Sequence, residues 1–416
     1  MPAPGENLRI DPARLWDSLM EMAKIGPGVA GGCNRQTLTD ADGEARHLFA
    51  GWCRAAGMTM GVDSMGNMFA TRAGEDPGAL PVYMGSHLDT QPTGGKYDGV
   101  LGVLGALEVV RTMNDMGVRT RRPIVVTNWT NEEGARFAPA MLASGVFAGI
   151  HTEGYAKGRT DLDGKVFGEE LARIGWVGDE KVGARRMHAM LELHIEQGPI
   201  LEAEGKTIGV VTHGQGLWWL EITLTGKEAH TGSTPMKMRV NAGLGMARIT
   251  ERVHQIAMSH QPDAVGAVGQ VKVFPNSRNV IPGKVVFTVD IRSPEQSKLD
   301  AMKAEVIRAA HAVAAELGLG CSIEEVGHFD PVTFDPGLVK IVRGAAEKLG
   351  HSHMDIVSGA GHDACWINRV APTVMVMCPC VDGLSHNEAE EITPDWAAAG
   401  TDVLLHAALE VAEVVG

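Results

Sequence analysis

The sequence has few cysteines and no long apolar run, and both absences narrow what the protein can be. Its six cysteines, at positions 33, 53, 321, 365, 378 and 380, include no CxxC pair, which is typical of reduced thiols in a cytosolic protein. The Cys378-Pro379-Cys380 segment could bind a soft metal, but buried thiols are the preferred interpretation. No segment is long and apolar enough for a transmembrane helix, and the polar start Met1–Asn7 has no apolar core of the secretory kind. We therefore expect a cytoplasmic protein.

Clusters of basic residues are also missing. The 416 residues include 37 Lys and Arg against 51 Asp and Glu, a formal net charge of -14. Such a chain is a poor partner for nucleic acid or for an anionic membrane. A small anionic substrate remains possible, but it would need a local arginine that acts against the overall negative field.

The pattern of apolar residues divides the chain into two domains, and no internal repeat interrupts it. A length of 416 residues with 44% hydrophobic content can bury a large core. Residues 1–211 and 328–416 alternate helical and strand patterns, which predicts an α/β domain with a mostly parallel sheet flanked by helices. Residues 212–327 read as β-α-β-β-α-β, the order of an α+β ferredoxin-like domain inserted into the first. The two connections, near 212 and 327, are candidate hinges.

Histidines and carboxylates follow four apolar runs of the first domain. The runs and the residues that follow them are Val82–Met84 with His87, Ile124–Val126 with Glu132 and Glu133, Met190–Leu193 with His194, and Thr373–Met377 with His386. In an open parallel sheet, ligands bind in the crevice beyond the carboxyl ends of the strands. These side chains are therefore expected to lie together.

The adjacent pair Glu132-Glu133 can divide one task. Successive side chains on an extended or turning backbone point to opposite sides. One carboxylate can then bind a metal while its neighbour acts as a base toward a water on that metal.

Counting the ligands in this crevice predicts two metal ions. Five residues qualify: His87, Asp98, Glu133, His194 and His386. Five exceed what one tetrahedral zinc with an open position requires, but if Asp98 bridges, each of two metals receives three protein ligands. Asp89, two positions after His87, could hold the imidazole ring from behind as an acceptor. Nitrogen and oxygen donors suit Zn, Mn, Co or Ni and do not choose among them.

From about Leu15 to its end, the chain resembles the amidase, hydantoinase and carbamoylase branch of the dinuclear metallopeptidase-like hydrolases. This branch includes N-carbamoyl-L-amino acid hydrolases, beta-ureidopropionases and allantoate amidohydrolases. The resemblance rests on the segments Gly85–Thr90, Asp98-Gly99, Asn131–Phe137, His194–Pro199, Gly226–Pro235, Asn279–Gly283, Asp290–Arg292 and Ser385–Glu388. It implies cleavage of the ureido C–N bond of a small N-carbamoyl-L-amino acid, with two divalent ions per subunit.

Site residues follow from the same resemblance. One metal would take His87, Asp98 and His194, and the other Asp98, Glu133 and His386, with Glu132 as the base. In the inserted domain, Arg292 and Asn279 would grip the substrate carboxylate, and His230, from the partner subunit of a homodimer, would stabilise the oxyanion. Gln197 would contact the substrate, and Gly361 would either contact it or form a tight structural turn. The inserted domain would then serve dimerisation and act as a lid.

Other functions stay open at this point. A beta-ureidopropionase or an allantoate amidohydrolase would use the same ligands. A dipeptidase-like exopeptidase is disfavoured by His194, because related exopeptidases usually have a carboxylate at that position. A non-catalytic binding protein is disfavoured by Glu132, because it has no need of a base beside two metals.

Overall fold

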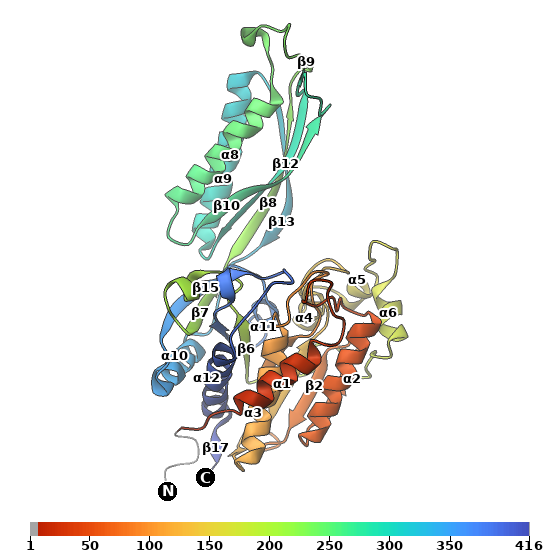
Figure 1. Ribbon diagram of the computed structural model, residues 1–416, viewed down its shortest axis with the longest axis vertical. Coiled ribbons are helices and arrows are strands. Elements are labelled where there is room, and N and C mark those ends of the chain that lie inside the picture. Colours follow the sequence, from red (N-terminus) through yellow and green to blue (C-terminus); the bar gives the residue numbers. More distant parts are fainter. Residues whose placement is uncertain (1–6, 416) are drawn as a thin grey trace. The chain divides into compact units, whose positions relative to one another are not determined.

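In a computed structural model of the protein, the structure is described for residues 7–415. These residues divide into two compact units (Figure 1). The first unit holds the chain up to Thr212 and again from Phe334, and the second holds His213–Thr333. Within residues 7–415, no helix combines the length and apolar character that a bilayer crossing requires.

A nine-stranded sheet forms the centre of the first unit, and its strand order is β1-β2-β5-β3-β6-β16-β7-β14, with β15 paired to β7. The central strands β5, β3, β6 and β16 are parallel, and the outer pairs β1/β2, β2/β5, β16/β7 and β14/β7 are antiparallel. The strands are β1 (Thr59–Val62), β2 (Met68–Arg72), β3 (Val82–His87), β5 (Ile124–Trp129), β6 (Ala189–Ile195), β7 (Ile208–Gly214), β14 (Val332–Thr333), β15 (His353–Ser358) and β16 (Thr373–Cys378). A separate ribbon pairs β4 (Arg119–Thr120) with β17 (Val414–Val415).

Helices cover both faces of this sheet. Leu193 meets Gly105 of α3 and Gly400 of α12, whereas the next side chain along β6, Glu192, accepts a hydrogen bond from Ala364 of α11. Because successive strand residues point to opposite faces, α3 and α12 lie on one side and α11 on the other. The helices are α1 (Pro12–Met22), α2 (Asp40–Ala55), α3 (Val100–Asp115), α4 (Leu142–Phe147), α5 (Glu153–Lys157), α6 (Phe167–Arg173), α7 (Ile200–Ala203), α10 (Pro336–Leu349), α11 (Asp363–Ile367) and α12 (Pro394–Ala412).

An antiparallel sheet of order β10-β12-β8-β13 forms the second unit, with α8 and α9 together on one face (Figure 1). Alternate residues of β8, such as Leu220 and Ile222, are buried against those helices, as expected for a sheet with one covered face. The elements are β8 (Gly216–Thr225), β9 (Ala229–His230), α8 (Ala242–Ser259), β10 (Val265–Phe274), β11 (Val280–Ile281), β12 (Lys284–Ser293), α9 (Gln296–Leu317) and β13 (Gly320–Phe329). A small β9/β11 ribbon is added to the ferredoxin-like order.

The predicted fold class is confirmed, with a sheet that is parallel at its centre and a β-α-β-β-α-β unit inserted in the chain. The second connection lies later than the sequence pattern indicated. The expected limit at 327 would cut β13, which stays paired with β8 as far as Phe329 opposite Leu217. The second unit therefore ends at Thr333.

Candidate active site

The central strands bring the sequence-predicted residues to one edge of the sheet. His87 is the last residue of β3, and His194 is the last but one of β6, the strand beside it. Glu132 and Glu133 follow β5 on the other side of β3, and His386 follows β16, which pairs with β6. Asp98 lies just before α3. The strand pattern thus predicted correctly that these residues meet.

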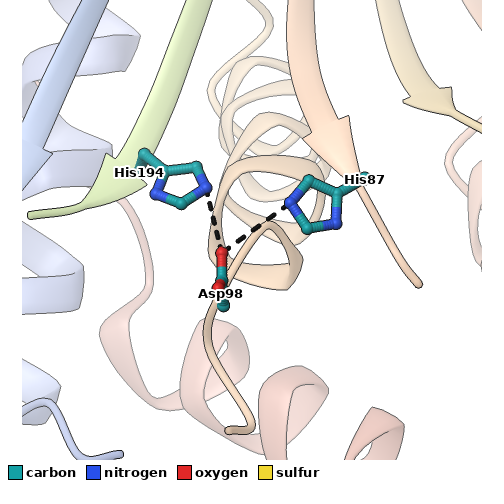
Figure 2. Close-up of side chains that lie close together, drawn as sticks. All are labelled: His87, Asp98 and His194. Carbon is teal, nitrogen blue, oxygen red and sulfur yellow. Dashed lines mark ion pairs between the residues drawn. The ribbon is translucent and has the colours of Figure 1, made fainter. Parts of the chain in front are cut away.

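His87, Asp98 and His194 form the first compact group (Figure 2). Both imidazole rings turn toward the same carboxylate oxygen, Asp98 Oδ1, which lies 3.2 Å from His194 Nε2 and 3.7 Å from His87 Nε2. All three residues are buried. The 3.7 Å contact of His87 is too long for a hydrogen bond. One ligand atom of each residue lies within 4.8 Å of the others, so the three could share one metal ion.

Backbone contacts fix the tautomer of both histidines. His87 Nδ1 lies 2.9 Å from the carbonyl oxygen of Asp89, and His194 Nδ1 lies 2.9 Å from that of Ile195. A carbonyl only accepts, so in the neutral rings each Nδ1 carries the proton and each Nε2 keeps a lone pair. Both Nε2 atoms are buried without a hydrogen-bond partner among the described residues. Buried lone pairs of this kind fit a bound divalent metal, and backbone orientation of the ring is common behind metal-binding histidines.

Asp98, Glu133 and His386 form a second group on the other side of the Asp98 carboxylate. His386 Nε2 lies 3.4 Å from Asp98 Oδ2 and 3.4 Å from Glu133 Oε2. One oxygen of Asp98 therefore faces the first group and the other faces the second. This is the arrangement that a carboxylate bridging two metals requires.

The electrostatics of the site call for positive charge. Burial first, and then the charges of Asp363 and Glu133, raise the pKa of Glu132 well above its usual range. Burial also opposes charge on His194, yet Asp98 and then Glu192 raise its pKa to about 9. Carboxylates this close disfavour one another's ionisation, and a divalent cation relieves that repulsion.

A tight loop holds Glu132 beside the first group. Its Oε2 lies 3.5 Å from His87 Nε2, and its carbonyl accepts from the backbone N–H of Met141 at 2.6 Å, which folds the loop back on itself. The two oxygens of Asp89 accept from the backbone N–H groups of Glu132 and Glu133, each at 3.3 Å. The Asp89 side chain therefore holds the Glu132 loop. The His87 ring is held by the backbone carbonyl of Asp89, and not by its carboxylate as the sequence suggested. The aspartate oxygen is 3.8 Å from that ring nitrogen, too far for a hydrogen bond.

Several supporting residues were not found from the sequence. Glu390 Oε1 accepts from the backbone N–H groups of Tyr97 and Asp98, at 3.0 and 3.1 Å, and its Oε2 accepts from Ser385. Gln91 donates to Glu133 Oε2 at 2.7 Å. Glutamates and glutamines in loops are usually solvated, so nothing in the spacing separates these from surface residues.

Beside His194, a third group adds Glu192 and His362. Their rings and carboxylate are buried, and the His194 and His362 rings meet edge to face with centroids 4.4 Å apart. Glu192 is already engaged by the Ser86 hydroxyl at 2.6 Å and by the N–H of Ala364 at 3.0 Å. This group therefore supports the wall of the site.

In the second unit, the structure brings His230 and Asn279 together. His230 of β9 pairs with Val280 of β11, and the N–H of Thr231 donates to the backbone oxygen of Asn279 at 3.0 Å. His230 Nδ1 accepts from the backbone N–H groups of Gly232 and Ser233, at 3.0 and 3.2 Å. An N–H only donates, so the neutral ring of His230 carries its proton on Nε2 and presents a donor.

Arg292 lies at the far end of the same unit. It is eight residues beyond Lys284, where β12 leaves the β9/β11 ribbon, a separation of roughly 26 Å at about 3.3 Å per residue. Its guanidinium is paired with Asp290, with Nη2 2.8 Å from Oδ2. Arg292 and Asn279 of one chain therefore lie too far apart to bind the same carboxylate. The expectation from the sequence that they bind it together needs a residue from a second chain.

Gln197 and Gly361 lie in the first unit. Gln197 has a positive φ of 57°, and its side-chain amide donates to Asp98 Oδ2 at 2.9 Å. Gly361 is exposed in the loop before α11, next to buried His362. Added to Gly361, a Cβ would lie 2.9 Å from Met141 Cε of the Glu132 loop. The loop before α11 therefore lies close to the loop that holds Glu132.

Comparison with known proteins agrees with this geometry. Residues 83–410 match the sequence profile of Peptidase family M20/M25/M40. The chain belongs to this family. Within the family, it is 74% identical to an N-carbamoyl-L-amino-acid amidohydrolase of Rhizobium meliloti, over 100% of both chains. It is 35% identical to a protein of the same name from Geobacillus stearothermophilus, over 96% of this chain and 98% of the relative.

A crystal structure supports the same membership. The amidase of the hydantoinase/carbamoylase family from Burkholderia multivorans superposes with a TM-score of 0.96 at 56% identity, over 97% of this chain and 98% of the other. The resemblance expected from the sequence motifs is thereby confirmed. The M20/M25/M40 fold and the His, Asp and Glu groups are compatible with divalent metal binding.

Proposed function

We propose that the chain hydrolyses N-carbamoyl-L-amino acids to the L-amino acid, ammonia and carbon dioxide. The observation that carries this proposal is 74% identity, over both full lengths, to an enzyme named for that reaction. The buried histidines and carboxylates at the sheet edge give the reaction a site. Six free cysteines, five of them buried, accord with a cytoplasmic enzyme.

We assign two divalent ions to this site. One would be held by His87, Asp98 and His194, and the other by Asp98, Glu133 and His386. The opposite orientation of the two Asp98 oxygens supports the bridge. When bound, the ions supply Lewis acidity toward the ureido carbonyl and lower the pKa of water. Zn, Mn, Co and Ni all fit these donors.

Glu132 is assigned as the general base. Its carboxylate lies beside the first metal position but is not needed there as a ligand. It can take a proton from the attacking water and return it to the leaving ammonia.

We assign substrate binding to His230, Asn279 and Arg292. The donor on His230 Nε2 would stabilise the oxyanion, and the planar guanidinium of Arg292 would pair with the substrate carboxylate. Arg292 and the ribbon that carries His230 and Asn279 lie at opposite ends of one unit. A single substrate would therefore be bound by Arg292 of one subunit and by His230 and Asn279 of its partner. Gln197 and Gly361 would contact the same substrate, and Asp89 would keep the Glu132 loop in place.

A homodimer through the second unit is part of this proposal. The strand β10 is an edge of its sheet, and it exposes apolar side chains at Val265, Val271 and Phe274, each more than 40% accessible. An open edge with exposed apolar residues is a typical place for a second chain to pair.

A substrate panel with a base variant tests the proposed function. We expect ammonia release from N-carbamoyl-L-methionine, and a slower reaction with N-carbamoyl-beta-alanine and with allantoate. Glu132→Gln should keep its metals and lower kcat on the order of 100-fold or more, the scale of lost general-base catalysis. A higher kcat/KM for the beta substrate or for allantoate than for every alpha substrate would replace the proposal with a beta-ureidopropionase or an allantoate amidohydrolase.

The carboxylate anchor has its own test. The amide of the N-carbamoyl amino acid should lose most of its kcat/KM with the wild type and much less with Arg292→Ala. Arg292→Lys should not restore the acid reaction, because an ammonium cannot reproduce the planar fork. Equal rates on acid and amide with the wild type would remove Arg292 from substrate binding.

A further inference from the structure

A glycine-rich loop near the start of the chain binds, at the surface, a carboxylate that no step of the reaction uses. The side chain of Glu388 accepts three backbone hydrogen bonds from this loop: from Ala30 at 2.5 Å and Gly32 at 3.1 Å on Oε2, and from Val29 at 3.3 Å on Oε1. Several N–H groups converging on one anion form a backbone nest. We call residues 26–33 the nest loop.

The nest loop is a closed turn attached to the candidate active site on a second side. Its ends are joined by the hydrogen bond from Asn34 N to Gly26 O at 2.7 Å, and it is braced by Gly28 N to Gly32 O at 2.8 Å. Cys33 exchanges two backbone hydrogen bonds with Gly94, at 2.9 and 3.0 Å. Gly94 precedes Asp98 by four residues. The nest loop therefore connects the segment of the bridging aspartate with the segment of Glu388.

Two glycines leave the space that this contact needs. At Gly28, a Cβ would lie 2.3 Å from Glu388 Oε2, and at Gly32 a Cβ would lie 2.6 Å from Glu388 Cα. Neither glycine has a positive φ, so close approach, rather than backbone conformation, explains glycine here. The loop is thus fitted to the glutamate.

His386, two residues before Glu388, depends on support from its surroundings. Its φ is 54°, in the left-handed region that side chains rarely adopt, and its side chain is 53% exposed. Of the other four candidate ligands, His87, Asp98 and His194 are buried, and the side chain of Glu133 is 5% exposed. Such a backbone persists only where neighbouring contacts over-determine it.

We propose that Glu388 is a positioning residue for His386. Seated in the nest loop, it fixes segment 385–390 so that the His386 ring faces Asp98 and Glu133, and it thereby sets the affinity of the second metal position. The proposal rests on the two-metal site of the proposed function. Glu390 acts differently, because it holds the N–H groups of Tyr97 and Asp98 and so supports both positions.

Matched variants test the contact from both sides. Glu388→Gln weakens the nest by removing the charge, and Gly28→Ala displaces the carboxylate from the loop side. Glu391→Gln is the first control, because it makes the same charge change at an exposed position in the same loop. Val29→Ala is the second, because the Val29 side chain is 99% exposed and its backbone N–H is retained.

The measurement is chelator competition from the metal-loaded protein, followed by elemental analysis. Both test variants should lose one ion per chain at about 10 to 100-fold lower chelator strength than the wild type, the range for residues that orient a ligand. The other ion should be released as in the wild type. Saturating metal should restore kcat in both variants, because Glu388 does not reach substrate.

Unchanged release of both ions in Glu388→Gln and Gly28→Ala would overturn the inference. So would equal weakening of both ions, or a kcat that stays low at saturating metal. If the wild type itself holds one ion, the two-metal proposal is wrong and this inference is wrong with it. If the wild type holds two ions, a negative result in the variants counts against Glu388 alone.

Discussion

Gly99, at the start of α3, offers a sharp test of the first metal position. Its φ is 68° with ψ of -44°, and a Cβ there would lie 2.4 Å from His87 Cε1 and Nε2. Gly99→Ala would therefore put a methyl group in the space of the imidazole. The ring cannot simply move aside, because its Nδ1 is bound to the Asp89 carbonyl and the surroundings are buried.

Two costs add in this variant. A backbone at positive φ and negative ψ is sparsely populated and costs a residue with a side chain about 1–3 kcal/mol, and crowding a packed interior costs about 1–3 kcal/mol more. The free energy of unfolding should fall by about 2–6 kcal/mol. Displacing the His87 ring should also weaken the first metal position by at least about 100-fold, beyond the usual effect of losing a residue that only orients a ligand.

Gly117, just after the same helix, provides the matched control. Its φ is 62°, but nothing lies within 4 Å of its Cβ position. Gly117→Ala should show the backbone cost of about 1–2 kcal/mol and keep both ions. Chemical denaturation in the presence of chelator gives the stabilities, and elemental analysis after dialysis gives the metal content. Two ions in Gly99→Ala, with the stability of Gly117→Ala, would refute the placement of the His87 ring.

Three further predictions concern the site and its surroundings. Asp98→Ala should lose both metals together, because the proposed bridge would serve both. One fully occupied position by elemental analysis would contradict the bridge. A mixture of His230→Ala chains and Glu132→Gln chains should regain activity, because one site of the heterodimer then has both residues intact. If no activity returns although subunit exchange is demonstrated, His230 does not act across a dimer. Burial raises the pKa of the Cys53 and Cys365 thiols to about 12. These thiols should therefore resist iodoacetamide at pH 8 until the protein is denatured. Rapid labelling of the native protein, measured by mass spectrometry, would contradict their burial.

The parts of the site carried by strands could be predicted from the sequence. His87 and His194 end apolar runs, and such runs in a parallel sheet place their last residues at one edge. The inserted unit was equally visible, because alternating residues such as Leu220 and Ile222 mark a sheet with one buried face. The start of the last helix is also legible in the sequence, because Thr393 directly before Pro394 is a typical N-cap, and its side chain accepts from Trp396 N.

The parts carried by loops could not be predicted in this way. Loop residues have no period, so nothing in the sequence distinguished Glu390, which is 4% exposed, from a solvated glutamate. For the His87 ring, the backbone oxygen of Asp89 competed with its side chain, and only the turn geometry decides between them. The pairing of Arg292 with Asp290, by contrast, follows from the sequence, because residues two apart on a strand point to the same face.

The position of β16 between β6 and β7 has a consequence for synthesis. The inserted unit draws its own four strands from residues 216–329, so its sheet can close while later residues are still being added. The central sheet cannot, because the strand that joins its halves, residues 373–378, is made among the last. Domains generally fold as units, starting from the N-terminal side during translation. Here the edge of β6 stays unpaired until β16 is synthesised, near the end of translation. The candidate site likewise lacks His386 until then.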